Sequence, residues 1–381
     1  MTIGLDISVL NDRQRTGIAV YTYNLIDALL KLNKKDKFIL FGIATFETFG
    51  YLKNLPFKNY PNVEMRIYCM PARFFRIAFL LWQKLNWPPI ESFVGKVDIF
   101  HSFNWYMPPQ RYGRKVGTVF DLTSIIYPKW HNGRTVQLDK IRFERLAKNA
   151  DCIITISENS KKDFQKFWPN TEVKVIYPGV SSIFTNKIDI KITNKVLRKY
   201  NFRSGYFLSV ATLEPRKNLE GLVKAYIKSG IKRSLVVVGL GGWKNQKLLD
   251  LLKKHKDKII ITGFVPEGDL VVLYQQALCL VYISLYEGFG LPVLEALSCG
   301  TPVICSKTSS QGEVGGDAVI YVDPNNIQDI SEALKKIQDE KLRAKLIQKG
   351  LMQAKKFSWT QSTTGLNKLY HEFDLKPKLS T

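Results

Sequence analysis

Short apolar runs alternate with amphipathic stretches along the whole chain. The run at residues 2–10 precedes a stretch in which Ile18, Tyr21, Leu25 and Leu29 recur at helical spacing, which predicts a strand followed by a helix. This alternation of strand and helix is typical of a parallel sheet covered by helices. Further apolar runs predict more strands in the N-terminal half of the chain, at 37–43, 63–70, 97–103, 115–122, 151–157 and 173–179.

The pattern starts again in the C-terminal half, where apolar runs predict strands at 206–213, 233–242, 258–265, 278–285, 302–306 and 318–322. Residues 177–187 are rich in turn formers and predict a linker between the two sets. We therefore predict an α/β fold with two doubly wound, Rossmann-like domains facing each other across a cleft, at residues 1–180 and 187–357. A last helix is predicted over about Thr360–Phe373.

Length and composition agree with a two-domain globular protein. The chain has 381 residues, and a single core stops growing near roughly 250–300 residues. The N-terminus lacks the pattern of a secretory signal, and the apolar run Ile77–Trp82 is far shorter than the roughly 20 residues of a spanning helix. The five cysteines are scattered and form no CxxC pair, so we expect neither disulfides nor a zinc site, and a cytoplasmic location.

The chain is strongly basic, with 56 Lys and Arg against 33 Asp and Glu and a net charge of +23. Such a charge is consistent with anionic partners, which include nucleic acid, anionic lipid and phosphorylated substrates. A lysine-rich composition with solvated charges is the alternative. Charge by itself does not choose between these explanations.

The stretch "SLYEGFGLPVLEALSCGTPVI" runs from Ser284 to Ile304 and follows an apolar strand. Its Pro292 suits the first turn of a helix, where the missing N–H costs nothing. Gly288 and Gly290 let the backbone approach a ligand closely, and the amides at a helix N-terminus favour a phosphate. The stretch therefore predicts a phosphate site at the carboxyl end of a strand.

Two glutamates flank this predicted phosphate site. Glu295, expected in the first helical turn, suits the hydroxyls of a ribose. Glu287 lies on the far side of the phosphates and suits the hydroxyls of a second sugar, so the spacing has the layout of a nucleotide-sugar site. The structural alternative is a tight turn in which Glu295 only partners the helix dipole.

The same stretch resembles the signature of retaining GT-B glycosyltransferases, in the large family that includes bacterial mannosyl- and glucosyltransferases. Their motif is two glutamates separated by seven residues with G-F-G-L-P between them, and this chain carries it from Glu287 to Glu295. The resemblance implies that Glu287 contacts the donor sugar and Glu295 the ribose. It also implies that the residues between them meet the diphosphate and sugar through their backbone: Gly288, Phe289, Gly290 and Leu291.

The resemblance covers nearly the whole chain. "SVATLEPRKNLEGLVKAY" resembles the family's diphosphate loop, in which Lys217 matches the phosphate-binding lysine. Many members also carry an arginine directly after the strand, where this chain has Ala211, and we expect Arg216 to replace it. "GFVPEGDLVVLYQQA" resembles the segment whose backbone, near Val265, meets the nucleobase.

The first domain resembles the family's acceptor side. "RTGIAVYTYNL" resembles the glycine loop that reaches donor and acceptor, and only Gly17 remains of its frequent glycine pair. In "TVFDLTSIIYPKWH" Phe120 stands where a histidine often precedes the aspartate, while Asp121 is kept and is expected to serve catalysis on the acceptor side. His101, at another strand end, is either an acceptor-side cleft contact or a structural histidine. The closing helix, residues 358–376, is expected to cross back onto this domain.

These likenesses imply retaining transfer of a hexose from a nucleotide-sugar to a lipid-linked or polysaccharide acceptor. Lys217 and Arg216 would stabilise the departing diphosphate, and Glu287 would orient the sugar. No cofactor or metal is expected, since no DxD-like pair stands at a strand end. "TLEPRKN" and "FDLT" most resemble mannosyltransferase-like members that build bacterial surface polysaccharides, so GDP-mannose is the expected donor, with GDP-rhamnose or a UDP-sugar as alternatives.

Residues 73–89, "RFFRIAFLLWQKLNWPP", interleave aromatic and basic residues. Such a segment can lie on an anionic membrane with its apolar face down, which would suit both a lipid-linked acceptor and the positive charge. A buried helix against the first sheet is the alternative.

Three other classes of protein share features with this sequence. A nucleic-acid-binding protein would need clustered basic residues with stacking aromatics, and no such module stands in the chain, so we expect no nucleic-acid partner. A dinucleotide oxidoreductase would need G-x-G-x-x-G after the first strand, and "VVVGLGGW" is a weak match. A glycogen synthase relative is compatible with "EGFGLP", whereas the chain is short for a phosphorylase. The sequence does not indicate an oligomeric state.

Overall fold

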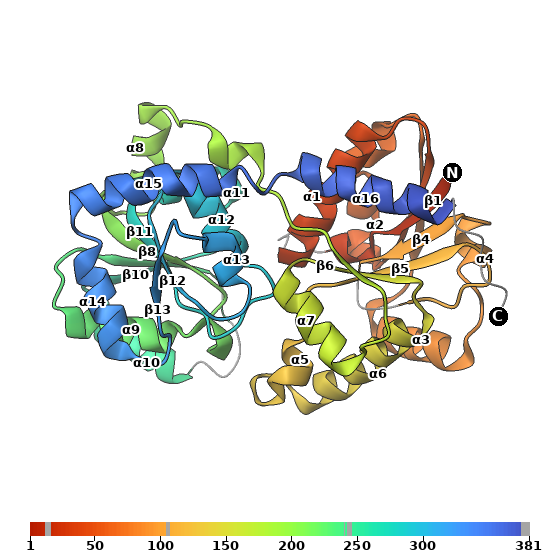
Figure 1. Ribbon diagram of the computed structural model, residues 1–381, viewed down its shortest axis with the longest axis horizontal. Coiled ribbons are helices and arrows are strands. Elements are labelled where there is room, and N and C mark those ends of the chain that lie inside the picture. The colour runs from red at the N-terminus through yellow and green to blue at the C-terminus, as the bar shows by residue number, and fades with distance from the viewer. Residues whose placement is uncertain (12–16, 104–106, 240, 242–245, 375–381) are drawn as a thin grey trace. The chain divides into compact units, whose positions relative to one another are not determined.

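The computed structural model of the chain forms two compact units, each built on a parallel sheet (Figure 1). Unit 1 comprises Met1–Gly179 and the C-terminal segment from Ser358, and unit 2 comprises Val180–Phe357. The structure describes residues 1–11, 17–103, 107–239, 241 and 246–374, with the backbone alone at 75–80, 83, 246 and 374.

Unit 1 holds a seven-stranded parallel sheet in the order β3-β2-β1-β4-β5-β6-β7. Most of its central strand residues are buried, because helices cover both faces of such a sheet. The strands are β1 (Thr2–Asp6), β2 (Lys37–Ala44), β3 (Val63–Cys69), β4 (Ile99–Ser102), β5 (Arg114–Val119), β6 (Cys152–Thr155) and β7 (Val173–Val175).

The helices of unit 1 begin at polar caps where the sequence supplies them. Asn132 accepts a hydrogen bond from the amide of Arg134, and Ser157 accepts one from the amide of Ser160, which satisfies N–H groups that have no partner inside the helix. The helices are α1 (Gly17–Leu32), α2 (Phe46–Lys53), α3 (Ala72–Leu85), α4 (Glu91–Val94), α5 (Thr123–Ile126), α6 (Gly133–Asn149), α7 (Glu158–Phe167) and α16 (Trp359–Asp374), with 3₁₀ turns η1 (Ser8–Asn11), η2 (Pro56–Asn59) and η3 (Pro128–Trp130).

Unit 2 holds a six-stranded parallel sheet in the order β10-β9-β8-β11-β12-β13. The strands are β8 (Tyr206–Val210), β9 (Leu235–Val238), β10 (Ile259–Gly263), β11 (Ala277–Tyr282), β12 (Val303–Ser306) and β13 (Ile320–Val322). The chain first moves outward from β8 to β10 and then returns to continue from β11 on the other side of β8. This order places a reversal of direction between β8 and β11, which is the switch point where ligands bind in such sheets.

Helices cover both faces of the unit 2 sheet (Figure 1). Apolar residues of α9 and α14 pack with the strands in one large core, and α9 ends at Gly230, whose left-handed φ of +69° suits a residue without a side chain. The helices are α8 (Ile190–Lys199), α9 (Leu219–Ser229), α10 (Gln246–Lys254), α11 (Glu267–Gln276), α12 (Leu291–Ser298), α13 (Gln311–Gly315), α14 (Ile327–Lys336) and α15 (Glu340–Ala354), with 3₁₀ turns η4 (Ser182–Thr185) and η5 (Pro215–Lys217).

The fold class predicted from the sequence is confirmed. Each strand of both sheets falls within a predicted apolar run, apart from shifts at the ends. The run at 278–285 is the clearest shift, because β11 ends at Tyr282 and the following residues already belong to the loop. The predicted closing helix is α16, which lies beside α1 in unit 1 (Figure 1). Among the described residues, none of the helices combines the length and apolar character that crossing a bilayer requires.

Gly179, the last residue before the chain enters unit 2, packs closely against the backbone of Ser358 and Trp359. A Cβ atom at this position would lie 2.2 Å from the backbone nitrogen of Trp359 and 2.6 Å from the carbonyl carbon of Ser358. The point at which the chain leaves unit 1, Gly179, therefore contacts the point at which it re-enters unit 1, Ser358.

We predict that Gly179→Ala lowers the free energy of unfolding by about 1–3 kcal/mol, because backbone atoms cannot rotate away as a side chain can. Gly133→Ala is the matched control, since nothing lies within 4 Å of a Cβ built at that helix-start position. Thermal unfolding followed by fluorescence compares the two variants. Equal stability in both would contradict the packing argument.

Candidate functional site

Two loops on either side of the unit 2 switch point bring charged residues together. The loop after β8 contains η5, with Arg216 and Lys217, and the loop after β11 contains Glu287. Because β8 and β11 are hydrogen-bonded neighbours and run parallel, both loops leave the same edge of the sheet. The amide of Leu285 also donates to the carbonyl of Arg216, at 2.8 Å, and ties one loop to the other.

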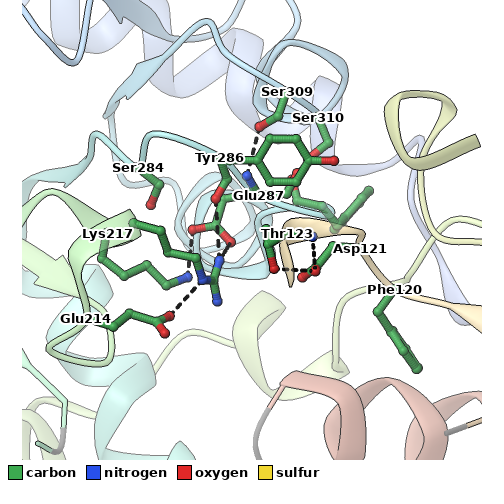
Figure 2. Close-up of polar contacts among 12 residues, drawn as sticks. Phe120, Asp121, Thr123, Glu214, Lys217, Ser284, Tyr286, Glu287, Ser309 and Ser310 are labelled. Carbon is green, nitrogen blue, oxygen red and sulfur yellow. Dashed lines mark hydrogen bonds and ion pairs between the residues drawn. The ribbon is translucent and has the colours of Figure 1, made fainter. Parts of the chain in front are cut away.

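The Glu287 carboxylate lies between both cations (Figure 2). Nη1 of Arg216 is 2.7 Å from Oε2, and Nζ of Lys217 is 2.6 Å from Oε1. The hydroxyl of Tyr282 donates to the same Oε1 at 2.8 Å and accepts from Nζ of Lys217 at 2.8 Å. Nε of Arg216 pairs with the Glu214 carboxylate at 2.8 Å, so two acids and two bases form a formally neutral cluster.

Burial and charge act on this cluster in opposite directions. Burial alone raises the pKa of Glu287, but Arg216 and Lys217 outweigh it and lower the pKa to about 2. Burial also lowers the pKa of Lys217. The negative charge of Glu287 raises this pKa and the positive charge of Arg216 lowers it, so that the pKa of Lys217 is lowered overall. Glu287 is therefore ionised at neutral pH and serves as a hydrogen-bond acceptor, not as a proton donor.

The glycine turn after Glu287 leads into α12 as predicted. Gly290 caps the helix with φ +110°, a conformation that side chains rarely allow, and Pro292 stands in the first turn. Phe289 is buried edge-to-face against Phe357, with ring centroids 5.6 Å apart. Leu291 is the first residue of the helix. The turn therefore presents backbone, not a side chain, at the N-terminus of α12.

Glu295 lies one turn later than predicted. Because α12 begins at Leu291, Glu295 is its fifth residue, and the first turn of the helix contains no acid. The explanation of Glu295 as a helix-dipole partner therefore fails, since that effect is confined to the first turn. The Tyr274 hydroxyl donates to its Oε2 at 2.8 Å, and burial raises the pKa of Glu295 to about 7. This carboxyl can gain or lose a proton near neutral pH.

Two residues predicted to meet the donor through their backbone, Val265 and Gly17, lie at the ends of other elements. Val265 is buried in the connection between β10 and α11. Gly17 begins α1, and a Cβ there would meet nothing within 4 Å, so packing does not require a glycine. Arg15 and Thr16, which belong to the predicted glycine loop, lie outside the described residues.

In unit 1, Asp121 follows β5 and stabilises the start of α5. Its Oδ1 accepts from the amide of Thr123 at 3.0 Å and from the Thr123 hydroxyl at 2.7 Å. Phe120, in the position where the resemblance would place a histidine, is buried edge-on against Tyr21, with ring centroids 5.3 Å apart. Position 120 is thus part of the hydrophobic packing of unit 1.

His101 is a structural histidine, the second of the two alternatives. It is fully buried, and both ring nitrogens have partners within unit 1. Nδ1 lies 2.5 Å from the hydroxyl of Tyr370 on α16, and Nε2 lies 2.7 Å from Oγ1 of Thr118. Burial lowers the pKa of His101 to about 3, so the ring is neutral at physiological pH. His101 links the central sheet to the closing helix and does not contact a ligand.

Sequence reasoning missed several residues that hold the charged cluster in place. Tyr282 ends an apolar strand and could have been noticed as a polar group at a carboxyl end. Glu214 stands in the same short loop as the predicted cations. Ser309 and Ser310 follow the neighbouring strand β12 and hydrogen-bond to the Glu287 turn. Within the described part of the chain, no three His, Cys, Asp or Glu side chains gather as they would around a metal ion.

Comparison with known proteins places the chain in a family. The model described as Glycosyltransferase Family 4 matches residues 15–182, and the model described as Glycosyl transferases group 1 matches residues 195–352. The chain is also 36% identical over 371 residues to the O-antigen chain mannosyltransferase B of Escherichia coli, covering 92% of this chain and 94% of that protein. The chain belongs to the group 1 glycosyl transferases. The resemblance based on the two glutamates is thereby confirmed.

A second relative and a solved structure agree with this membership. The glycosyltransferase is 29% identical over 338 residues to the O-antigen chain mannosyltransferase RfbU of Salmonella typhimurium, with 85% of this chain and 87% of that protein covered. Its fold matches the sucrose-phosphate synthase of Thermosynechococcus elongatus with a TM-score of 0.76 at 19% identity, over 98% and 99% of the two chains. The latter likeness supports the GT-B fold.

We predict that Glu287→Gln destabilises the glycosyltransferase by about 3 kcal/mol at pH 7, because it leaves Lys217 buried without its anion. Glu220→Gln is the control: Glu220 pairs with Lys224 at 2.5 Å, but its side chain is 42% exposed, so its loss should cost less than about 1 kcal/mol. Urea unfolding at several pH values measures both.

The pH dependence of the Glu287 effect has a definite sign. The folded pKa of about 2 lies below the ordinary value of 4.5, so the carboxylate contributes stability above pH 4.5 and loses it as the pH falls towards 2. The difference between the unmodified chain and Glu287→Gln should therefore shrink over this range. A constant difference from pH 7 down to pH 3 would show that the ion pairs are not its source.

Proposed function

We propose that this glycosyltransferase moves mannose from GDP-mannose to a lipid-linked or polysaccharide acceptor in the synthesis of a bacterial surface polysaccharide such as an O-antigen. One observation carries the proposal: an ionised Glu287 bound to two cations at the switch point of a sheet, within a chain related to O-antigen mannosyltransferases. GDP-rhamnose and UDP-sugars are the alternative donors.

The unit 2 cluster suits a departing diphosphate. Lys217 and Arg216 are held by Glu287, Glu214 and Tyr282 before any ligand arrives, so little reorganisation is needed when negative charge develops on the leaving group. Fixed charges and dipoles of this kind are usually the largest single contribution to catalysis. The N-terminus of α12, reached through the Gly290 turn, adds backbone amides directed towards an anion.

We assign retention of configuration and independence of metal to the reaction. The bond between the sugar carbon and the diphosphate oxygen breaks, and the acceptor oxygen forms its bond on the same face of the sugar. The acceptor proton passes to an oxygen of the departing diphosphate. No pair of acid and base carboxylates like that of glycoside hydrolases is required. Glu287, with its low pKa, accepts hydrogen bonds from the sugar hydroxyls and orients the ring.

Glu295 is assigned to the ribose, and Val265 to the nucleobase through its backbone. A carboxylate at 295 would accept hydrogen bonds from ribose hydroxyls, and its pKa of about 7 means that donor binding there favours loss of a proton. Asp121 remains the proposed acceptor-side residue in unit 1, in addition to its local contact with Thr123. Gly17 remains assigned to the loop beside the donor.

A transfer assay with candidate donors tests the proposal. Radiolabelled GDP-mannose, GDP-rhamnose, UDP-glucose and ADP-glucose are offered with a lipid-linked oligosaccharide acceptor, and nuclear magnetic resonance identifies the anomer formed. We expect transfer from GDP-mannose, in the presence of a chelator, to give an α-linked product. Transfer from a UDP-sugar alone, a β-linked product or loss of activity with the chelator would each overturn the corresponding part of the proposal.

Two variants test the ribose and sugar assignments separately, by transfer and by binding of free GDP. Glu295→Ala should weaken binding of free GDP by about 1–3 kcal/mol, the cost of losing a charged hydrogen bond. Glu287→Ala should nearly abolish transfer while leaving binding of free GDP much closer to that of the unmodified chain. Calorimetry measures GDP binding. An equal loss of GDP affinity in both variants would contradict the assignment of Glu295 to the ribose and Glu287 to the sugar.

We also propose that helix α3 contacts a membrane. Phe74, Leu81 and Leu85 recur at intervals of seven and four residues, and their side chains are 47%, 48% and 64% exposed. This spacing places them on one face of the helix. Trp82, the residue after Leu81, is half-buried, with its ring 5.5 Å from that of Phe93. Among the described side chains of α3, Trp82 packs against unit 1, whereas Phe74, Leu81 and Leu85 are exposed.

The basic residues Arg73 and Lys84 are also exposed on α3, where they can meet anionic headgroups. Each basic residue near such a surface contributes about 1 kcal/mol, an attraction that salt screens within a Debye length of about 8 Å. An anionic membrane is therefore the proposed partner of this face, and the site of synthesis the cytoplasmic side of the cell membrane.

Liposome flotation provides the test of membrane contact. We expect the chain to float with phosphatidylglycerol vesicles at low salt and to be released as salt rises, whereas Leu81→Glu with Leu85→Glu stays unbound. Ile190→Glu with Ile192→Glu is the matched control, since these residues are 66% and 52% exposed on α8 of unit 2. Binding that survives the α3 substitutions contradicts the proposal, and a loss of folding in that variant supports the buried alternative.

A further inference from the structure

The loop after β12 lies beside the loop that carries Glu287. β12 pairs with β11 in parallel, with Cys305 opposite Tyr282, so the two chains leave the same edge of the sheet side by side. Residues 307–311, which we call the serine loop, follow the last residue of β12. The serine loop contributes no charged group to the cluster around Glu287, yet it contacts the backbone of that residue.

Two serines hold the backbone on both sides of the Glu287 side chain (Figure 2). Oγ of Ser309 accepts from the amide of Glu287 at 2.9 Å. Oγ of Ser310 lies 2.9 Å from the carbonyl oxygen of Glu287 and 2.8 Å from that of Phe289, and its single O–H is shared between them as a bifurcated donor. Ser310 is fully buried, so water does not compete for these bonds.

Ser309 adopts a backbone conformation that a serine does not favour. Its φ is +55°, and the other non-glycine residues with positive φ among the described ones are three asparagines, a residue type that tolerates the left-handed region. A glycine at position 309 would adopt it without strain. The hydroxyl, which accepts from the Glu287 amide in this strained conformation, offers an explanation for the serine.

The same segment anchors the start of the Glu287 loop. The carbonyl of Ser284 accepts from the hydroxyl of Ser306, from Oγ1 of Thr308 at 3.2 Å and from Nε2 of Gln311 at 3.2 Å. The end of β12 and the serine loop thus hold the backbone from Ser284 to Phe289 by hydrogen bonds at both of its ends.

We propose that Ser309 and Ser310 are positioning residues for sugar transfer, which set the backbone from which the Glu287 carboxylate reaches the donor sugar. This inference rests on the proposed function. Neither hydroxyl has the Glu287 carboxylate as its hydrogen-bond partner, so the effect passes through the backbone. Small displacements of an orienting group reduce turnover strongly even where the reacting groups are intact.

Two substitutions of Ser309 separate positioning from stability. Ser309→Gly and Ser309→Ala both remove the hydroxyl, but only glycine also relieves the left-handed strain. We expect kcat with GDP-mannose to fall by about tenfold to a hundredfold in both variants, with little change in KM. The Tm of Ser309→Gly should equal or exceed that of Ser309→Ala. Ser310→Ala should show the same fall in kcat, and Ser182→Ala, at an exposed serine, should show none.

The outcomes distinguish this inference from the proposed function. A kcat of Ser309→Gly equal to that of the unmodified chain would overturn the inference, because the hydroxyl would then be unnecessary. A kcat that follows Tm across the variants, low for alanine and normal for glycine, would also overturn it, since the serine loop would then act only through stability. Absence of transfer by the unmodified chain with every donor would overturn the proposed function and this inference with it.

Discussion

The ion pairs of Glu287 with Arg216 and Lys217 are the interaction around which unit 2 is arranged. Removing such charges from water costs several kcal/mol per ion, and the attraction between them offsets this cost only when the geometry is close. Here the two contacts measure 2.7 and 2.6 Å, and Tyr282 completes the partners of the carboxylate. Buried ion pairs of this kind are weak sources of stability, so the fold by itself does not account for their presence.

The fold explains how residues some 70 positions apart meet in this cluster. The cations belong to the loop after β8 and the carboxylate to the loop after β11, which are neighbours only because the strand order reverses between them. The loop after β12, the next strand, supplies the serines that hold the carboxylate's backbone. Three consecutive strands of the sheet thus provide charge, orientation and support at one edge.

Unit 1 uses its polar residues differently. His101, Thr118 and Tyr370 form a buried chain of hydrogen bonds that fastens α16 to the central strands β4 and β5. Phe120 adds its ring to the packing around Tyr21, so the position that often carries a histidine in related enzymes has an apolar role here. Asp121 is the predicted acceptor-side residue whose side chain is only partly buried, and it also stabilises its own turn.

The sheets and the principal site loops could be predicted from the sequence, because these depend on local patterns. Apolar runs mark the strands, and the Gly-Phe-Gly-Leu-Pro stretch fixes the entry to α12 through the conformational freedom of Gly290 and the ring of Pro292. Which side chains meet depends instead on how distant parts of the chain fold together. Whether His101 faces a ligand or the closing helix depends on a tyrosine 269 residues away. The partners of Glu287 and the contacts of Ser309 likewise follow from strand order, and residue spacing along the chain carries no record of them.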